Sequence, residues 1–396
     1  MTRRERWILF VALVCQAVGV GVTVGSFTLF VEPLEQAFSA PRAQVSFGNS
    51  LLVIALALAG TSVGSLLDRG FARRVMFLGG MLMGGALLLA ASATHLWMLA
   101  FAALIAGVAI PTLGPLAGMS LVSRAIAKAD RGRAMGIVSM GTPLGSGLFA
   151  AIVGWAISQW GWRGAYGLLA LLTLAIVLPL VGFLIPSRLE STDAEGRVET
   201  SLALGEIARM PAFWLTAIVF ALVMGFSTGW ASQLAPFLTR AGLGEAEVAG
   251  LIALQFWMGI PGSLVFGALA DRVGLHVLFL VAILFQAAAF ACYALGVSVV
   301  GLAVLAVGLG FSIGGMIPLF SLILGRQVGA GALGRAMGLS NLLLLPSTVA
   351  SITFASLVYD RRGAYTTALV VFSIGSLVAA VCLLVLARVE QPVRAG

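Results

Sequence analysis

The sequence predicts an all-α membrane protein whose twelve membrane-spanning helices form two parallel-repeat halves of six. The composition is 60% hydrophobic and only 10% charged, and a soluble chain of 396 residues needs more charge to cover its surface. Apolar residues come in runs long enough to cross a bilayer, which takes about 20 residues at about 1.5 Å each. Short motifs also recur in the same order in both halves.

The first half opens on an arginine-rich stretch followed by a long apolar run. That run is too long for a signal peptide, so we expect an uncleaved first helix. Each run must be helical in lipid, because every backbone amide then finds a partner within its own segment. The six spans of this half are expected at residues 7–31, 45–67, 75–92, 96–122, 134–160 and 165–185.

A polar stretch rich in Glu and Arg interrupts the apolar pattern at residues 186–211. We interpret it as a cytoplasmic linker between one half, residues 1–185, and the other, residues 212–396. Its last part, residues 202–210, is expected to form a short amphipathic helix on the inner membrane surface. The six spans of the second half are expected at residues 212–238, 248–270, 277–295, 299–324, 336–358 and 364–387.

The net charge of +8 reflects membrane topology and not a nucleic-acid partner. With the N-terminus inside, the 23 Lys and Arg residues fall on the cytoplasmic side, apart from Arg42, Arg163, Arg240, Arg361 and Arg362. Basic residues concentrate in cytoplasmic loops of membrane proteins. The sequence therefore predicts a multi-pass protein of the plasma membrane, in a bacterium the inner membrane, with both termini in the cytoplasm.

Three short motifs indicate that the halves are repeats. Residues 64–69 (GSLLDR) recur as 267–272 (GALADR), residues 133–136 (RAMG) recur as 335–338, and residues 163–166 (RGAY) recur as 362–365. Parallel repeats of six helices, with a substrate site near the midplane between them, are typical of transporters.

The first of these motifs resembles a known signature. Gly64, Asp68 and Arg69 precede the basic pair Arg73 and Arg74. This pattern resembles the signature between the second and third helices of the major facilitator superfamily, and the resemblance extends over nearly the whole chain. It implies the major facilitator fold, transport by alternating access, and a gating role for this motif and its second copy. The gating residues so implied are Gly64, Asp68, Arg69, Arg73, Arg74, Asp271 and Arg272.

Asp68 is placed at the cytoplasmic end of its predicted helix. A carboxylate at a helix C-terminus opposes the helix macrodipole and needs compensation. Arg69, or the positive N-terminus of a neighbouring helix, can supply it. A contact of this kind can be made in one conformation and broken in another, as a gate requires. An ordinary interfacial charge pair is the alternative.

Further segments resemble the bacterial branch related to monocarboxylate transporters and oxalate–formate exchangers. They are residues 27–34 (FTLFVEPL), 41–46 (PRAQVS), 132–136 (GRAMG) and 211–214 (PAFW). This resemblance implies a small organic monocarboxylate as substrate. Ser263 stands where that branch carries an arginine able to bind a carboxylate, so the anion would be held by neutral donors or would enter protonated. The residues themselves favour the alternative, a neutral or amphipathic solute against an aromatic wall of Phe27, Phe30, Trp230 and Trp257.

Polar and aromatic residues inside the spans are the candidate substrate contacts. An amide or hydroxyl in hydrocarbon must find a partner, which is either a ligand or a neighbouring helix. The candidates are Thr23, Ser26, Phe27, Phe30, Ser139, Trp230, Gln233, Gln255, Trp257, Ser263 and Asn341.

Two other classes of protein are disfavoured. An intramembrane enzyme needs a catalytic group at depth, whereas His95 and His276 fall at span ends and no span pairs carboxylates or shows metal-ligand spacing. We therefore expect no catalytic residue, metal or cofactor. A channel is expected to show a filter or pore ring and a symmetric oligomer, whereas a duplicated single chain favours a monomeric carrier. Its expected partners are a small-molecule substrate, the lipid bilayer and, where transport is coupled, protons, for which Glu32 is the nearest carboxylate.

Overall fold

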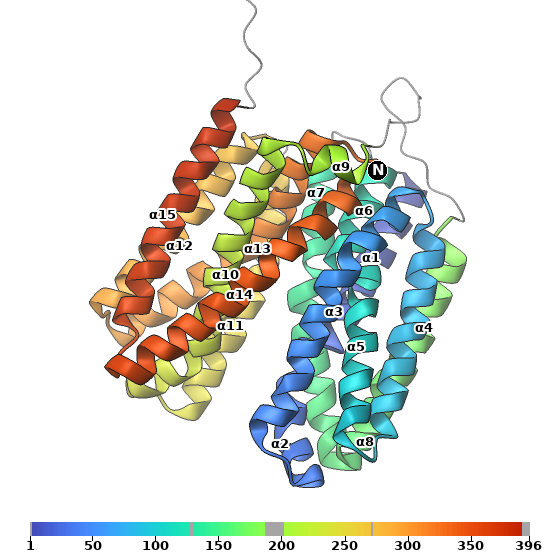
Figure 1. Ribbon diagram of the computed structural model, residues 1–396, viewed down its shortest axis with the longest axis horizontal. Helices are drawn as coiled ribbons and strands as arrows, with labels where there is room; N and C mark the ends of the chain where they lie inside the picture. The colour runs from blue at the N-terminus through green and yellow to red at the C-terminus, as the bar shows by residue number, and fades with distance from the viewer. Residues whose placement is uncertain (1, 127–129, 187–201, 271, 390–396) are drawn as a thin grey trace, which may run out of the picture. The chain divides into compact units, whose positions relative to one another are not determined.

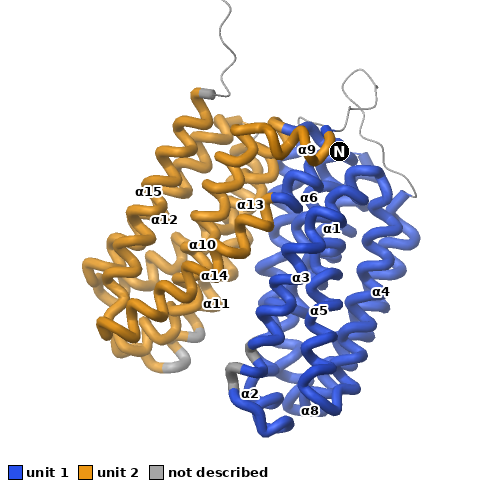
Figure 2. The backbone as a smooth tube through the Cα atoms, viewed as in Figure 1, with its two compact units in different colours: residues 1–202, 328–339 blue, residues 203–327, 340–396 orange. Residues whose placement is uncertain are grey.

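The computed structural model describes residues 2–126, 130–186, 202–270 and 272–389, and within them it consists of fifteen helices with no strand (Figure 1). The chain divides into two compact units (Figure 2). Unit 1 comprises residues 1–202 and 328–339, and unit 2 comprises residues 203–327 and 340–396. The predicted all-α fold is confirmed, and every predicted span has a helical counterpart.

Unit 1 contains α1 to α8, and proline and glycine break several of its spans. The helices are α1 (Arg3–Gly21), α2 (Phe27–Phe38), α3 (Arg42–Asp68), α4 (Ala72–Ala91), α5 (Leu96–Leu113), α6 (Pro115–Ala125), α7 (Arg131–Ser139) and α8 (Gly141–Leu184). The fourth predicted span divides into α5 and α6 at Gly114, whose backbone is extended. Pro115 then opens α6, a position where its missing N–H is not needed.

Unit 2 holds the remaining helices, which have 21 to 30 residues each apart from the short α9. They are α9 (Leu204–Ile207), α10 (Pro211–Arg240), α11 (Glu245–Ala270), α12 (Leu275–Leu295), α13 (Val299–Val328), α14 (Leu333–Arg362) and α15 (Thr366–Val389). The short helix α9 occupies the place predicted for the amphipathic helix. The first residues of α14, up to residue 339, belong to unit 1.

Ten of the described helical stretches are long and apolar enough to cross a membrane. One of them, Arg131–Leu184, has 54 residues and contains two predicted spans. Its chain direction changes at Gly161, whose φ of 67° and ψ of 179° interrupt the helical backbone. The first predicted span is not among the ten because a break at residues 22–26 divides it into α1 and α2.

Glycines let the helices of each unit pack with their backbones in contact. A Cβ on Gly145 of α8 would lie 2.0 Å from the carbonyl oxygen of Ala17 in α1. In unit 2, a Cβ on Gly310 of α13 would lie 1.9 Å from the carbonyl oxygen of Gln255 in α11. Such close approach is how small residues hold membrane helices together, where water offers no hydrophobic drive. Close packing at glycines is therefore present in both units.

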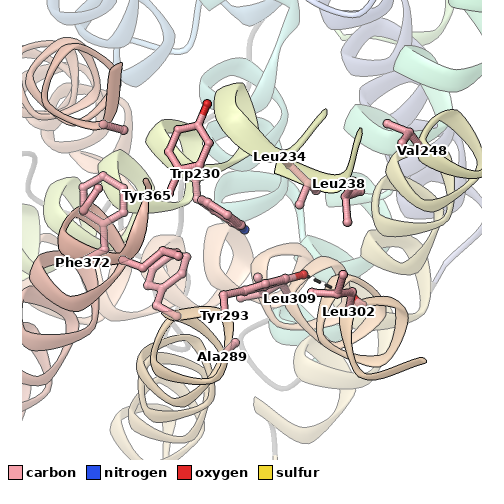
Figure 3. Packing of buried hydrophobic residues seen from close by; sticks show 14 of the residues in the cluster. Trp230, Leu234, Leu238, Val248, Ala289, Tyr293, Leu302, Leu309, Tyr365 and Phe372 are labelled. Carbon is pink, nitrogen blue, oxygen red and sulfur yellow. Dashed lines mark hydrogen bonds between the residues drawn. The ribbon is translucent and has the colours of Figure 1, made fainter. Parts of the chain in front are cut away.

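Aromatic and aliphatic side chains fill the core of unit 2 (Figure 3). Trp230 of α10 lies against Tyr293 of α12 and Tyr365, which precedes α15, with ring centroids 5.0 Å and 6.3 Å away. The Tyr293 hydroxyl donates to the carbonyl oxygen of Leu302 over 3.3 Å. Buried aromatic pairs of this kind contribute beyond their apolar area, roughly 0.5–1.5 kcal/mol each. The cluster ties together α10, α12, α13 and the junction of α14 with α15.

Candidate functional site

Asp68, at the C-terminus of α3, caps the N-terminus of α14. One carboxylate oxygen accepts from the backbone N–H of Gly334 at 2.9 Å, and the other accepts from that of Arg335 at 2.7 Å. These amides lie in the first turn of α14, where backbone N–H groups have no partner within the helix. The positive end of the α14 macrodipole also favours a carboxylate there. Asp68 is 4% exposed, so its charge depends on these donors.

Two arginines complete this contact, which we call the Asp68 latch: Asp68, Gly334, Arg335 and Arg124. The Arg335 Nε lies 3.4 Å from a carboxylate oxygen of Asp68. The same guanidinium donates through a terminal nitrogen to the carbonyl oxygen of Leu202. Arg124, in the last turn of α6, donates to the Asp68 carbonyl oxygen over 2.7 Å. The latch thus neutralises a buried carboxylate and gives a hydrogen-bond donor to the backbone carbonyl oxygen at the C-terminus of α3.

Glycines on both helices make the latch sterically possible. A Cβ on Gly64 would lie 2.0 Å from the carbonyl oxygen of Gly334, and one on Gly338 would lie 2.4 Å from that of Gly60. Each helix therefore presents two glycines four residues apart to the other. This is the small-residue pattern that permits close helix crossing in membranes. Only with the backbones this close can Asp68 reach the amides of α14.

Of the other predicted gating residues, Gly64 lies at the glycine crossing and the arginines have different surroundings. Arg69 follows α3 directly and is exposed, and its side chain makes no described contact with Asp68. The compensation expected from a neighbouring helix N-terminus is therefore seen, whereas that from Arg69 is not. Arg74 is exposed over the ring of Phe71 at 5.7 Å, Arg73 is half-buried and Arg272 is exposed. Asp271 lies outside the described residues.

Sequence reasoning assigned no role to Arg335, Gly334 or Arg124. The recurrence of RAMG at residues 133–136 and 335–338 was a usable signal, since its second copy contains Arg335. Nothing in the sequence places that copy beside Asp68, because 267 residues separate the two partners. The pairing follows only from the arrangement of α3 and α14.

The break in the first span sits among the candidate substrate residues. The hydroxyl of Thr23 donates to the carbonyl oxygens of Gly19 at 2.7 Å and Val20 at 3.3 Å. The hydroxyl of Ser26 donates to the carbonyl oxygen of Gly21 at 2.6 Å. Both side chains are buried, and both supply hydrogen bonds that an unbroken helix would have made with backbone amides. Discontinuous helices frequently form binding sites in transporters because they expose backbone polar groups to a cavity.

A small cavity of about 100 Å³ lies inside unit 1 next to this break. Thr23, Phe27 and Phe30 contribute to its wall, as do residues of α3, α4 and α5. Phe30 stacks on Tyr166 with ring centroids 3.9 Å apart and an interplanar angle of 12°. Among the described residues, the polar side chains in the wall are Thr23, Gln44 and Tyr166, and none of the lining residues is charged. The cavity suits an apolar group with one or two hydrogen-bonding atoms.

In unit 2, Gln233 belongs to a hydrogen-bonded chain and Trp230 to the aromatic core. The Gln233 amide donates to the hydroxyl of Ser356 over 2.9 Å and accepts from that of Tyr365 over 3.1 Å. Trp230 is 2% exposed. Gln233 is half-buried one helical turn further along α10, so polar and apolar anchors follow one another on this helix.

The remaining candidates occupy separate positions. The Ser263 hydroxyl in α11 donates to the carbonyl oxygen of Ile260 at 2.9 Å, within its own helix. Gln255 is nearly buried, and its side-chain oxygen accepts no hydrogen bond from the described residues. Trp257 is 45% exposed, and Asn341 is half-buried near the start of α14. Ser139, at the end of α7, is buried and its hydroxyl likewise has no partner among the described residues.

The sequence matches the Major Facilitator Superfamily over residues 9–351. It is 26% identical to Monocarboxylate transporter 13 of Bos taurus over 374 residues, which cover 92% of this chain and 85% of that protein. It is 30% identical to Monocarboxylate transporter 11 of Homo sapiens over 334 residues, covering 80% and 69%. The uncharacterized MFS-type transporter YhjX of Escherichia coli (strain K12) is 27% identical over 280 residues, covering 68% and 67%.

Solved structures share the fold over nearly the whole chain. The human organic anion transporter MFSD10 (TETRAN) aligns with a TM-score of 0.75 at 17% identity, covering 96% of this chain and 99% of that one. FucP in the outward conformation aligns with a TM-score of 0.74 at 15% identity, covering 98% and 100%. At such low identity the likeness concerns the fold alone.

Proposed function

Because the chain belongs to the major facilitator superfamily and is a transporter, not an enzyme, we propose that it carries a small organic monocarboxylate across the membrane by alternating access. The Asp68 latch is the observation that supports alternating access. It joins α3 to the start of α14 through the polar contacts of Asp68, beside the glycine crossing. Such contacts can be broken and remade without unpacking the hydrophobic core of either unit.

The proposed topology places the latch on the cytoplasmic side of the membrane. With both termini in the cytoplasm of a bacterium, Asp68 ends α3 at the inner membrane surface. Alternating access then requires the latch to open when the substrate site is to face the cytoplasm. Opening the latch costs the charge-assisted hydrogen bonds of Asp68, roughly 1.5–3 kcal/mol each where they are not replaced by water. Water reaching the opened surface offsets most of that cost.

The substrate class rests on two supports. Relatives covering most of this chain carry the name monocarboxylate transporter. The candidate contacts are neutral polar groups, such as the side-chain amides of Gln233 and Gln255. Neutral hydrogen bonds to a carboxylate are weaker than charge-assisted ones, so transport of the protonated acid, or with a coupled proton, suits these contacts.

The cavity in unit 1 favours a second candidate, a neutral or amphipathic solute. Its wall is apolar and aromatic, and a carboxylate buried there without a cation would carry a large desolvation cost. Ser263 does not change this, because its hydroxyl is uncharged and already donates to a carbonyl oxygen within α11.

Counterflow in reconstituted vesicles tests the two candidates. Purified protein is loaded with unlabelled solute, and uptake of labelled lactate, pyruvate or benzoate is followed at two pH values, beside an uncharged sugar or alcohol. Saturable counterflow of a monocarboxylate, faster at the lower pH, is the expected result. Ser263→Arg is measured in parallel, since an added cation should improve binding of the anionic form. Movement of the uncharged solute alone, by both proteins, would sink the monocarboxylate proposal.

A further inference from the structure

Arg240 ends α10 as an exposed cation. Its side chain forms no ion pair in the part of the chain that the structure describes, although exposed acidic residues occur at this end of unit 2. A cation in the last turn of a helix is favoured by the macrodipole, so that placement alone implies no ligand. The surroundings of the guanidinium give it a more specific meaning.

The Arg240 guanidinium stacks on the ring of Tyr359 and lies near that of Tyr365. The central carbon lies 3.9 Å from the ring centroid of Tyr359 and 6.0 Å from that of Tyr365. These rings stack on one another with centroids 4.6 Å apart and an interplanar angle of 27°. A guanidinium stacked by its face keeps the N–H groups at its edge available. Of its five donors, the structure shows one in use, a 3.5 Å contact with the Tyr365 hydroxyl.

Hydrogen bonds connect this cation to a candidate substrate contact. The Tyr365 hydroxyl, which accepts from Arg240, donates to the Gln233 side-chain oxygen over 3.1 Å. The Gln233 amide in turn donates to Ser356 over 2.9 Å. Gln233 lies seven residues before Arg240 on α10, so two helical turns place them on the same face. Polar groups therefore continue from the exposed end of α10 into unit 2.

Four other arginines on an aromatic ring or at a helix end have donors engaged, whereas Arg74 lies over the ring of Phe71 at 5.7 Å without a described hydrogen bond. Arg163 lies 4.1 Å over the ring of Trp162, but it donates to the carbonyl oxygen of Ala93 at 3.0 Å. Arg362 donates to the hydroxyl of Thr367 at 2.7 Å. Arg335 and Arg124 belong to the Asp68 latch. Arg240 differs from those four because the edge of its guanidinium remains open, and from Arg74 because it lies closer to a ring, at 3.9 Å, and has a second ring beside it.

We propose that Arg240 is a carboxylate-binding residue that captures the organic anion at the mouth of the C-terminal half before it reaches Gln233. The edge of the guanidinium matches a carboxylate through two parallel hydrogen bonds. The inference rests on the proposed function. In it, Arg240 provides the positive charge that α11 lacks because residue 263 is a serine.

The test compares Arg240→Gln and Arg240→Lys with wild type in the counterflow assay, using labelled benzoate and lactate. Arg240→Gln should raise the KM for both roughly tenfold or more, the loss expected for a hydrogen bond to a charged group, and change the maximal rate much less. Arg240→Lys should fall between, because it keeps the charge but not the planar fork. Raising the salt concentration should narrow the gap between wild type and Arg240→Gln through screening.

Arg361→Gln is the matched control, because it removes another exposed cation at the same end of unit 2. Its KM should stay within about twofold of wild type, since only general surface charge is lost. Thermal unfolding of each variant separates a purely structural role, which would lower stability without shifting KM. If wild type carries benzoate and Arg240→Gln keeps the same KM, the assignment of Arg240 is wrong and the proposed function stands. If the wild-type protein transports no monocarboxylate, the proposed function and the assignment of Arg240 are both wrong.

Discussion

Asp68 acts on α14 as a capping residue normally acts on its own helix. A side chain that accepts from the first-turn amides of a helix is worth roughly 0.5–2 kcal/mol, and here the acceptor is charged. Each of its two oxygens takes one amide, at 2.9 Å and 2.7 Å. The residue is therefore matched to its partner in charge, in number of acceptors and in position. A substitution at Asp68 that changes its charge, its number of acceptors or its reach should weaken the latch and leave the candidate substrate contacts unchanged.

Asp68→Asn should therefore slow transport more than it weakens substrate binding. Asparagine has one acceptor where aspartate has two, and its amide group would face a backbone N–H and the Arg335 guanidinium. The maximal counterflow rate and the dissociation constant are measured on the same preparation. Asp68→Glu, which keeps the charge and both acceptors, serves as the control and should retain more activity. A large loss of affinity at an unchanged maximal rate would place Asp68 in the substrate site instead.

Thr23 shows how a single hydroxyl supports a broken helix. It donates to the carbonyl oxygens of Gly19 and Val20 in the last turn of α1, of which that of Val20 also accepts from the backbone N–H of Gly25. Thr23→Val keeps the shape and deletes the donor, so it should lower the free energy of unfolding by about 1 kcal/mol or more. Thermal unfolding in detergent is the measurement. Thr239→Val is the control: Thr239 also bonds a carbonyl four residues back, but in a continuous, exposed stretch of α10. Equal effects would show that the break needs no special support.

At the scale of elements, the crossing of α3 with α14 depends on the absence of side chains. Gly60 and Gly64 on one helix face Gly334 and Gly338 on the other, and their backbones approach too closely for a Cβ. Tight crossings of this kind rely on van der Waals contact, which falls off within an ångström of separation. A methyl group at the crossing would hold the helices apart and move Asp68 away from its amides.

Gly64→Ala should consequently weaken the latch as strongly as a change at Asp68. Its methyl group would lie 2.0 Å from the Gly334 carbonyl oxygen, and backbone cannot move aside as a side chain can. Overpacking of this order costs roughly 1–3 kcal/mol. The maximal rate of counterflow should fall, and the unfolding temperature with it. Gly85→Ala in α4, where an added Cβ meets nothing within 4 Å, should leave both unchanged. A fully active Gly64→Ala would mean that transport does not need this close crossing.

For the whole molecule, the distribution of charge predicts the orientation in the membrane. Single cysteines placed in a background without Cys15, Cys292 and Cys382 test it. Gly205→Cys in α9 should resist a membrane-impermeant thiol reagent in intact cells, because the positive-inside rule places it in the cytoplasm. Ala241→Cys, just beyond α10, should react. Permeabilised cells provide the control, in which both should be labelled. The reverse pattern in intact cells would invert the topology and place the Asp68 latch on the outer side.

The all-α fold and the positions of the membrane spans could be determined from the sequence because they depend on local properties. A run of apolar residues needs no partner to be recognised as a helix in lipid, and each of the predicted spans has its helical counterpart. Breaks were harder to predict. Gly161 and Pro115 are visible in the sequence, but the interruption at residues 22–26 contains one glycine and no proline. It follows from how Thr23 and Ser26 satisfy the freed carbonyls.

The partners of the functional residues were decided by tertiary structure. The sequence identified Asp68 and Gln233 as functional candidates, but Asp68 finds its amides 266 and 267 residues away, and Gln233 finds Tyr365 after 132 residues. Hydrogen bonds act over about 3 Å and have no counterpart in residue spacing at such separations. Arg240 is an ordinary basic residue at a span end until the fold places Tyr359 beneath its guanidinium. Length and polarity therefore specify the helices, whereas only the packing of distant segments determines which polar groups meet.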